Sequence, residues 1–257
     1  MKSVSLCVVS ALLLAGMAAA HAAEMEQAGV MRDYTDVVSP PDQLAYEAGV
    51  KSYNKCLAEH GFKFGWTAWT HETGDTYQYS YVTDPVSWAA FDQMHEQGKP
   101  CGAVWQRDAN PHMKGETSAF MQVKPELSYA GKEKAASATL LEVTFFKLKP
   151  GHEAHEAFMA AAKKIAAAAA KAHWSNHYTV AQIMDADQGA PDFAVVSYAA
   201  NWAEFGKDPE QPLWKMVAGV YGKDAGMSMR KSLNAAVQES WSHVDRRNAD
   251  LSFTAAK

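Results

Sequence analysis

The sequence predicts an α+β fold in which one βαββαβ unit, arranged as a split βαβ motif, occurs twice in the chain. Three observations predict it. The order strand, helix, strand, strand, helix can be read over residues 34–98 and again over residues 140–205. A Trp-Ala-x-Phe sequence lies in the second helix of each copy, at Trp88 and at Trp202. A polar, small-residue segment at 131–138 separates the copies, as a linker would.

The first copy, residues 34–130, begins with a short strand that Pro40 and Pro41 end. Apolar residues at positions 46, 50, 53 and 57 then recur with the spacing of one helix face, and Gly61 ends that helix. The sequence Thr73-Gly74-Asp75 is a tight-turn signal between two strand-like runs. The predicted elements are a strand at 34–39, a helix from 43, strands at 62–72 and 76–82, and a helix from 84 to about 98.

The second copy, residues 139–254, follows the same plan. Its first strand ends at Pro150-Gly151, and the Ala-rich helix that follows is built from strong helix formers. The predicted elements are a strand at 140–149, a helix at 152–173, strands at 178–184 and 193–198, and a helix that begins near Trp202. Segments 125–129 and 249–253 also correspond, and each closes its copy.

The first 22 residues have the order of a secretory signal peptide. Lys2 supplies the charge, residues 6–17 are apolar, and Ala20-His21-Ala22 has the small-x-small pattern of a cleavage site. We therefore expect a mature chain that starts near Ala23, with a flexible leader over 23–33. We expect this chain in the periplasm or secreted, with no membrane association once the signal is removed.

Composition excludes several classes of protein. Hydrophobic residues make up 48% of the chain, which is enough to build a globular core. The net charge is −5 and lysine and arginine are not clustered beyond pairs, so we expect no nucleic-acid partner. No C-x-x-C sequence is present, which argues against zinc and thioredoxin-type sites. His152 and His155 are one residue short of the H-E-x-x-H spacing, so no metal site is expected.

The succession of strand, Pro-Gly, helix, hairpin and Trp-Ala-x-Phe helix resembles the dimeric α/β-barrel superfamily. This ferredoxin-like group includes the antibiotic-biosynthesis monooxygenases, the NIPSNAP proteins and the haem-binding chlorite dismutases. The resemblance implies two tandem ferredoxin-like repeats whose antiparallel sheets face each other as an intrachain barrel. One chain would then form the barrel that other members make by dimerising, as a monomeric pseudo-dimer, with further oligomerisation left open.

In such a barrel, alternation along each strand separates side chains under the helices from those between the sheets. We place the apolar set Ala181, Ile183, Phe193 and Val195 under the helices of the second copy. The residues then expected in a cavity between the sheets are Trp69, His71 and Gln78 from the first copy, and Tyr178, Gln182, Met184 and Glu142 from the second.

A cavity with aromatic walls and a few polar groups is typical of a small-molecule site. We therefore expect an exported protein that binds a small, partly aromatic molecule. The alternatives are a cofactor-independent, monooxygenase-like enzyme acting on an aromatic substrate and, less favoured, a haem protein resembling the chlorite dismutases. Otherwise no cofactor is expected, and the sequence identifies no catalytic residue.

Cys56 is expected toward the C-terminal end of the first helix of the first copy, and Cys101 lies just past the second helix. In a ferredoxin-like unit these helices lie side by side and run in the same direction, so both thiols would reach one end of the layer. A disulfide is one outcome, in keeping with an oxidising compartment. The other is a buried Cys56 and an inert, free Cys101.

Overall fold

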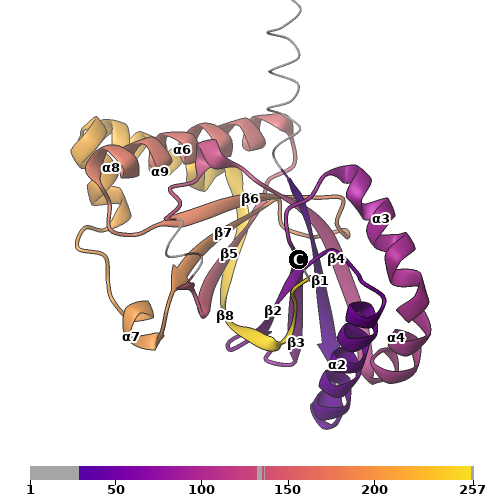
Figure 1. Cartoon of the computed structure of the whole chain (residues 1–257). Coiled ribbons are helices and arrows are strands. Elements are labelled where there is room, and N and C mark those ends of the chain that lie inside the picture. Colours follow the sequence, from indigo (N-terminus) through magenta and orange to yellow (C-terminus); the bar gives the residue numbers. More distant parts are fainter. Residues whose placement is uncertain (1–28, 132–134, 136, 256–257) are drawn as a thin grey trace, which may run out of the picture.

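The computed structural model of the chain describes residues 29–131, 135 and 137–255. In this part of the chain, eight strands form one closed antiparallel barrel (Figure 1). Around the barrel their order is β1-β3-β2-β8-β5-β7-β6-β4, and β4 returns to β1. The strands are β1 (Val30–Val38), β2 (Trp66–His71), β3 (Gln78–Thr83), β4 (Met113–Val123), β5 (Leu140–Leu148), β6 (Tyr178–Met184), β7 (Phe193–Ala199) and β8 (Val237–Phe253).

The barrel consists of two ferredoxin-like sheets, as the sequence predicts. Strands β4-β1-β3-β2 form one sheet and β8-β5-β7-β6 form the other. The sheets join where β2 pairs with β8 and where β4 pairs with β6. The 17-residue strand β8 is long enough to pair with β5 from Val237 onward and with β2 up to Phe253. One chain therefore closes the barrel.

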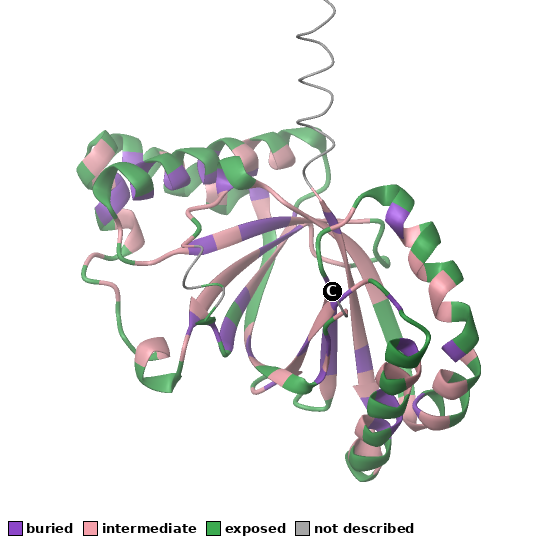
Figure 2. Ribbon diagram, in the orientation of Figure 1, coloured by how far each residue is buried: buried purple, intermediate pink, exposed green. Residues whose placement is uncertain are grey.

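Each sheet carries its own helical layer (Figure 1). The helices are α2 (Gln43–Glu59), α3 (Trp88–Gly98) and α4 (Gly102–Asp108) on the first sheet, and α6 (His152–Ala172), α7 (Trp202–Phe205), α8 (Leu213–Tyr221) and α9 (Lys223–Ala236) on the second. Their outward faces are largely exposed (Figure 2). Among the described residues, none of the helices combines the length and apolarity needed to cross a membrane.

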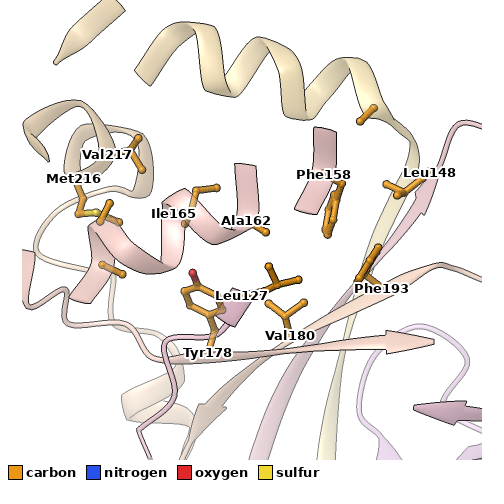
Figure 3. Close-up of a cluster of buried hydrophobic side chains, with 13 residues drawn as sticks. Leu127, Leu148, Phe158, Ala162, Ile165, Tyr178, Val180, Phe193, Met216 and Val217 are labelled. Carbon is orange, nitrogen blue, oxygen red and sulfur yellow. The ribbon is translucent and has the colours of Figure 1, made fainter. Parts of the chain in front are cut away.

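The second repeat has a tightly packed layer beneath α6. Small alanines let this helix approach the sheet closely, and Phe158 extends from it toward Phe193 on β7 (Figure 3). Phe158 stacks on Phe193 of β7 with ring centroids 4.6 Å apart. Helices α8 and α9 complete this core with Met216, Val217 and Ala236. The space between helix and sheet is filled by side chains.

The first repeat is held together differently. Helix α2 buries Tyr46, Val50 and Leu57, three residues of the predicted apolar stripe. The structure joins Cys56 at the end of α2 to Cys101, just before α4, by a disulfide bond with a Cα–Cα distance of 5.8 Å. Of the two outcomes that the sequence left open, the bonded one is present. The covalent link fixes one end of the helical layer.

Three sequence predictions need correction or lie outside the structure. Residues 30–33, expected in the flexible leader, belong to β1, because Val30 already pairs with Gln122 of β4. Residues 1–22, the expected signal peptide, lie outside the described residues, as do the rest of the leader up to 28 and part of the 131–138 linker. Strand β8 was not predicted as a separate element, because both of its faces carry polar residues over most of its length. The sequence predicts one helix that begins near Trp202, and the structure has the three helices α7, α8 and α9 in this region.

Removing the disulfide should destabilise the first repeat. The bond spans 45 residues, and a loop of that size corresponds to about 4 kcal/mol in the chain-entropy model. We expect Cys56→Ser/Cys101→Ser to lower the free energy of unfolding by about this amount in urea titrations. Reductant should lower the stability of the native protein to that of the variant and leave the variant unchanged. Equal stability of the oxidised protein and the variant would contradict this account.

Candidate functional site

A large cavity lies between the first sheet and its helices. Its volume is about 550 Å³, within the range of small-molecule pockets. Strands β1, β2, β3 and β4 form its floor, and α2, α3 and α4 form its walls. The sequence predicted the cavity between the two sheets. The structure instead places this one on the opposite face of the first sheet.

Eight of the nineteen described residues that line the cavity carry a Phe, Tyr or Trp ring. Tyr53 of α2 meets Trp105 of α4 edge to face at 5.3 Å, and Trp66 of β2 stacks near Tyr53 at 6.5 Å. The lining residues are Arg32, Tyr34, Asp36, Val50, Tyr53, Phe62, Phe64, Gly65, Trp66, Tyr81, Thr83, Phe91, Met94, His95, Gly98, Lys99, Gly102, Trp105 and Glu116. Lys99 and Gly102 flank the bonded Cys101, so the disulfide holds this part of the wall.

Polar groups gather at the floor of the cavity. The hydroxyl of Tyr46 donates a hydrogen bond to Asp36 Oδ2 at 2.5 Å and lies 2.8 Å from the Tyr81 hydroxyl. Asp36 is 1% exposed, and among the described residues its Oδ1 has no hydrogen-bond partner. Burial raises the pKa of Asp36 to about 7; the bond from Tyr46 opposes this shift, and the charge of Glu116 adds to it. This carboxyl can therefore gain or release a proton near neutral pH.

Arg32 is the one positively charged residue at the floor, among the lining residues that the structure describes. The guanidinium of Arg32 lies over the ring of Tyr34, 4.5 Å from its centroid, and donates to Ser118 Oγ at 3.1 Å. The same guanidinium also lies 5.4 Å from the ring centroid of Phe120. Planar contacts therefore fix this positive charge against the sheet. The cavity thus combines an aromatic chamber with a floor of one guanidinium and two carboxyl groups.

The interior of the barrel is mostly filled. Trp69 lies there, as the alternation predicts, among Leu141, Val143 and Ala194 of the second sheet. His71 shares this face and is buried, and Gln78 lies at the end of β3, where it donates to Asp75. None of the seven residues predicted to bind a ligand lines the aromatic cavity. An eight-stranded barrel leaves little interior space beyond its side chains, which explains why the larger opening lies elsewhere.

A polar cluster interrupts this apolar interior. His71 Nε2 lies 3.1 Å from Ser80 Oγ and 3.7 Å from Asp245 Oδ1, and His243 Nε2 lies 3.2 Å from Asp245 Oδ2. The two imidazole rings stack with centroids 4.3 Å apart. Burial lowers the pKa of His71, although the charge of Asp245 opposes the shift. Burial also raises the pKa of the nearby Asp33 to about 7, with a further contribution from Asp245.

The predicted cavity residues of β6 lie on the wrong face. Tyr178 packs beneath α6 with Val180, as Figure 3 shows, and Gln182 pairs directly with Phe193. Directly paired residues share a face, so Tyr178, Gln182 and Met184 point toward the helical side. The alternation read from the sequence places Phe193 on the same face as Ala181, whereas the structure places Phe193 on the same face as Gln182. This shift of one residue in the β6–β7 register reversed the assignment for β6.

Glu142 also points away from the barrel interior. Its neighbours Leu141 and Val143 face inward, and Glu142 is exposed on the outer surface. The alternation along β5 therefore contradicts its predicted place in the cavity.

Sequence reasoning missed most of the residues now seen at both sites. Arg32 and Asp36 alternate along β1 toward the cavity, but part of this strand was assigned to the leader. His243 was treated as isolated. The alternation of Trp241, His243 and Asp245 along β8 was the available signal, since these positions face β5 residues of the interior.

A haem protein is one of the alternatives that follow from the family resemblance. The aromatic cavity does not match the requirements of haem binding. A histidine-ligated haem needs an axial imidazole, and the single imidazole among the described lining residues is His95, on an exposed position of α3. The carboxyl groups of Asp36 and Glu116 at the floor would also repel the propionates. No chemistry is therefore assigned here through haem.

The raised pKa of Asp36 predicts a pH-dependent contribution to stability. Between its ordinary value of 3.8 and about 7, the folded chain keeps a proton that the unfolded chain has released. The stabilisation is thus complete below about pH 4 and is lost as the pH rises through about 7. We expect the unfolding free energy of Asp36→Asn, relative to the native protein, to increase across this interval in urea titrations.

The exposed Asp187→Asn serves as the matched control and should show no such trend. If the curves for Asp36→Asn and the native protein run parallel from pH 4 to pH 7, the assigned titration is wrong.

Comparison with known proteins supports the fold. No protein-family model and no curated protein sequence matches the chain. An anthrone oxidase-like protein is similar in structure, with a TM-score of 0.54 and 12% identity over 90% of this chain and 95% of that chain. A candidate monooxygenase from Lactobacillus acidophilus NCFM has a TM-score of 0.51 and 8% identity over 89% and 97%.

A mutant chlorite dismutase from Candidatus Nitrospira defluvii has a TM-score of 0.49 and 12% identity over 88% of this chain and 94% of that chain. At such low identities, the anthrone oxidase-like protein and the Lactobacillus protein show the shared fold and no shared activity. Together with the closed barrel, they establish that this chain has a ferredoxin-like α/β-barrel fold, with both sheets supplied by one chain.

Proposed function

We propose that this protein binds a small aromatic molecule in the cavity between the first sheet and helices α2, α3 and α4. One observation carries the proposal: the two repeats differ in how they use the space beneath their helices. In the second repeat, Phe158, Tyr178, Val180 and Phe193 fill it (Figure 3). In the first, a volume of about 550 Å³ lined largely by aromatic rings stays open.

The floor of the cavity indicates the chemistry of the molecule. Rings such as Trp105 and Phe91 favour a flat, apolar body, because aromatic pairs gain from stacked and edge contacts. Asp36 and Glu116 favour a hydrogen-bond donor at the inner end, such as a phenol hydroxyl or an amine. The guanidinium of Arg32 can donate a hydrogen bond to an oxygen of the same molecule. We therefore infer a small aromatic compound that carries a hydroxyl or amino group.

We further propose that the protein is exported and acts as a monomer. The Cys56–Cys101 bond supports export, because disulfides persist in oxidising compartments such as the periplasm. The closed barrel supports the monomer, because the two sheets pair with each other along both edges and leave no strand edge for a second copy.

A second candidate function is enzymatic, and the raised pKa of Asp36 favours it. A carboxyl that titrates near pH 7 at the floor of an aromatic cavity can take a proton from a bound phenol. The resulting phenolate would be an electron-rich species able to react with molecular oxygen. Such chemistry would resemble that of a cofactor-independent monooxygenase.

Filling the cavity should abolish binding without loosening the fold. Gly98 lines the cavity, and a Cβ built there would lie 3.8 Å from the Tyr53 hydroxyl, so a larger side chain has room to enter. Its φ of −78° suits any L-residue. We expect Gly98→Leu to weaken binding of naphthols and aromatic amines at least roughly tenfold, about 1.4 kcal/mol. Quenching of the fluorescence of Trp66 and Trp105 by a panel of such compounds measures this affinity.

Ala89→Leu is the matched control, since Ala89 is exposed on the same helix and outside the cavity. Mass spectrometry of the protein as purified, under native conditions, would identify a retained molecule. Equal affinity in the Gly98→Leu variant and the native protein would exclude this cavity as the site. A Soret band in the purified protein would instead favour haem.

Oxygen consumption with phenolic substrates tests the enzymatic candidate. Asp36→Asn keeps a hydrogen-bond acceptor for Tyr46 but cannot accept the proton. If Asp36 is the general base, turnover should fall by roughly 10²–10⁴-fold while binding stays within a small factor. Binding without oxygen consumption in the native protein would leave the binding function and exclude this reaction for the compounds tested.

A further inference from the structure

The polar cluster inside the barrel is separate from the aromatic cavity and has the composition of a metal site. It contains two imidazoles and one carboxylate from strands far apart in the sequence, His71 of β2 and His243 and Asp245 of β8. One ligand atom from each residue lies within 4.8 Å of the others. We propose that these three residues bind a divalent first-row transition-metal ion.

The distances fit a common ion. Ligand atoms about 2.0–2.2 Å from a tetrahedral metal lie roughly 3.3–3.6 Å from one another. The pairs His71 Nε2–Asp245 Oδ1 and His243 Nε2–Asp245 Oδ2 measure 3.7 and 3.2 Å. These contacts use the two oxygens of one carboxylate, and the three ligand atoms lie within 4.8 Å of one another, so the side chains must draw together to hold one ion. Two nitrogens with one oxygen suit zinc, iron or copper better than calcium or magnesium, which prefer oxygen ligands.

Two buried carboxyl oxygens in and beside this cluster have no hydrogen-bond partner among the described residues. Asp245 is 3% exposed, and among the described residues its Oδ1 accepts no hydrogen bond, since 3.7 Å from His71 is too long for one. Asp33 Oδ1, whose carboxyl is close enough to interact with the charges of Asp245 and His243, is also buried without a partner. The hydrogen bonds of the described residues thus leave both oxygens unpaired. A divalent cation would balance the buried charge of Asp245.

Neighbouring residues support binding and access. Ser80 Oγ contacts His71 Nε2 and also lies 3.0 Å from Thr35 Oγ1. If His71 Nε2 binds a metal, Ser80 therefore keeps its hydrogen bond with Thr35. The side chain of His243 is 15% exposed, which opens the cluster toward the β2–β3 turn. Three protein ligands leave a coordination position free for water or a small anion. The site therefore has ligands, a charge balance and an entry path.

Titration of the mature, untagged and chelator-treated protein with Co²⁺, followed by competition with Zn²⁺, tests this proposal. We expect about one equivalent of Co²⁺ to produce visible absorption bands and to raise the melting temperature, because the ion binds the folded state. His243→Gln and Asp245→Asn should each weaken Co²⁺ binding by more than roughly 100-fold, beyond the 10–100-fold effect of outer-shell groups. His152→Gln is the control, because that side chain is 84% exposed on α6 and should bind metal as the native protein does.

The outcomes are separable. No Co²⁺ binding by the native protein, or unchanged binding by a folded His243→Gln variant, would overturn the proposal. Equal losses in His152→Gln would also overturn it, because they would place the metal elsewhere. If Asp245→Asn does not fold, His243→Gln decides alone, since His243 is the more exposed of the ligands. Gly98→Leu should retain metal binding, which distinguishes this site from the aromatic cavity.

Discussion

Barrel closure by β8 is the constraint on which the rest of the structure depends. This strand pairs with β5 in its first part and with β2 in its last, so one segment joins the two sheets. Strand β4 performs the same task on the other side, between β1 and β6. Because β2 pairs with β8 and β4 pairs with β6, one face of each sheet lies toward the barrel interior and the other toward its helices. Every functional residue is consequently assigned to a face by the register of its strand.

The two repeats differ in how their helices pack on their sheets. Helix α6 carries small alanines and lies close to its sheet, where Phe158 and Phe193 stack and α8 and α9 close the layer. Helices α2, α3 and α4 meet their sheet mainly through large rings, which hold the layer apart at one end and leave the aromatic cavity. A disulfide then supplies cohesion that a continuous core would otherwise give. The divergence of the repeats is thus the source of the open volume.

Much of this fold could be predicted from the sequence, because turn signals and helix periodicity are local. Pro150-Gly151, the apolar stripe on α2 and the β2–β3 turn placed their elements correctly, and the faces of Trp69 and His71 followed. The β6–β7 register could not be read in the same way. Residues 185–192 are a long connection that fixes no pairing, and a shift of one residue exchanged the faces of Tyr178 and Gln182. Strand β8 was hidden because its alternate positions are polar on both sides, so no hydrophobic period marks it.

The two candidate sites lie back to back on the same strand. Along β1, Asp33 and Thr35 face the barrel interior, while Arg32, Tyr34 and Asp36 face the aromatic cavity. Strand β3 repeats the pattern, with Ser80 inward and Tyr81 outward. One sheet thickness therefore separates a cluster with two imidazoles from a floor with two carboxyl groups. Strands β1 and β3 pair directly from Asp33 to Val37, so the groups of both sites alternate along the same paired strands. Any ligand or ion that orders one site is thereby expected to order the strand that supports both.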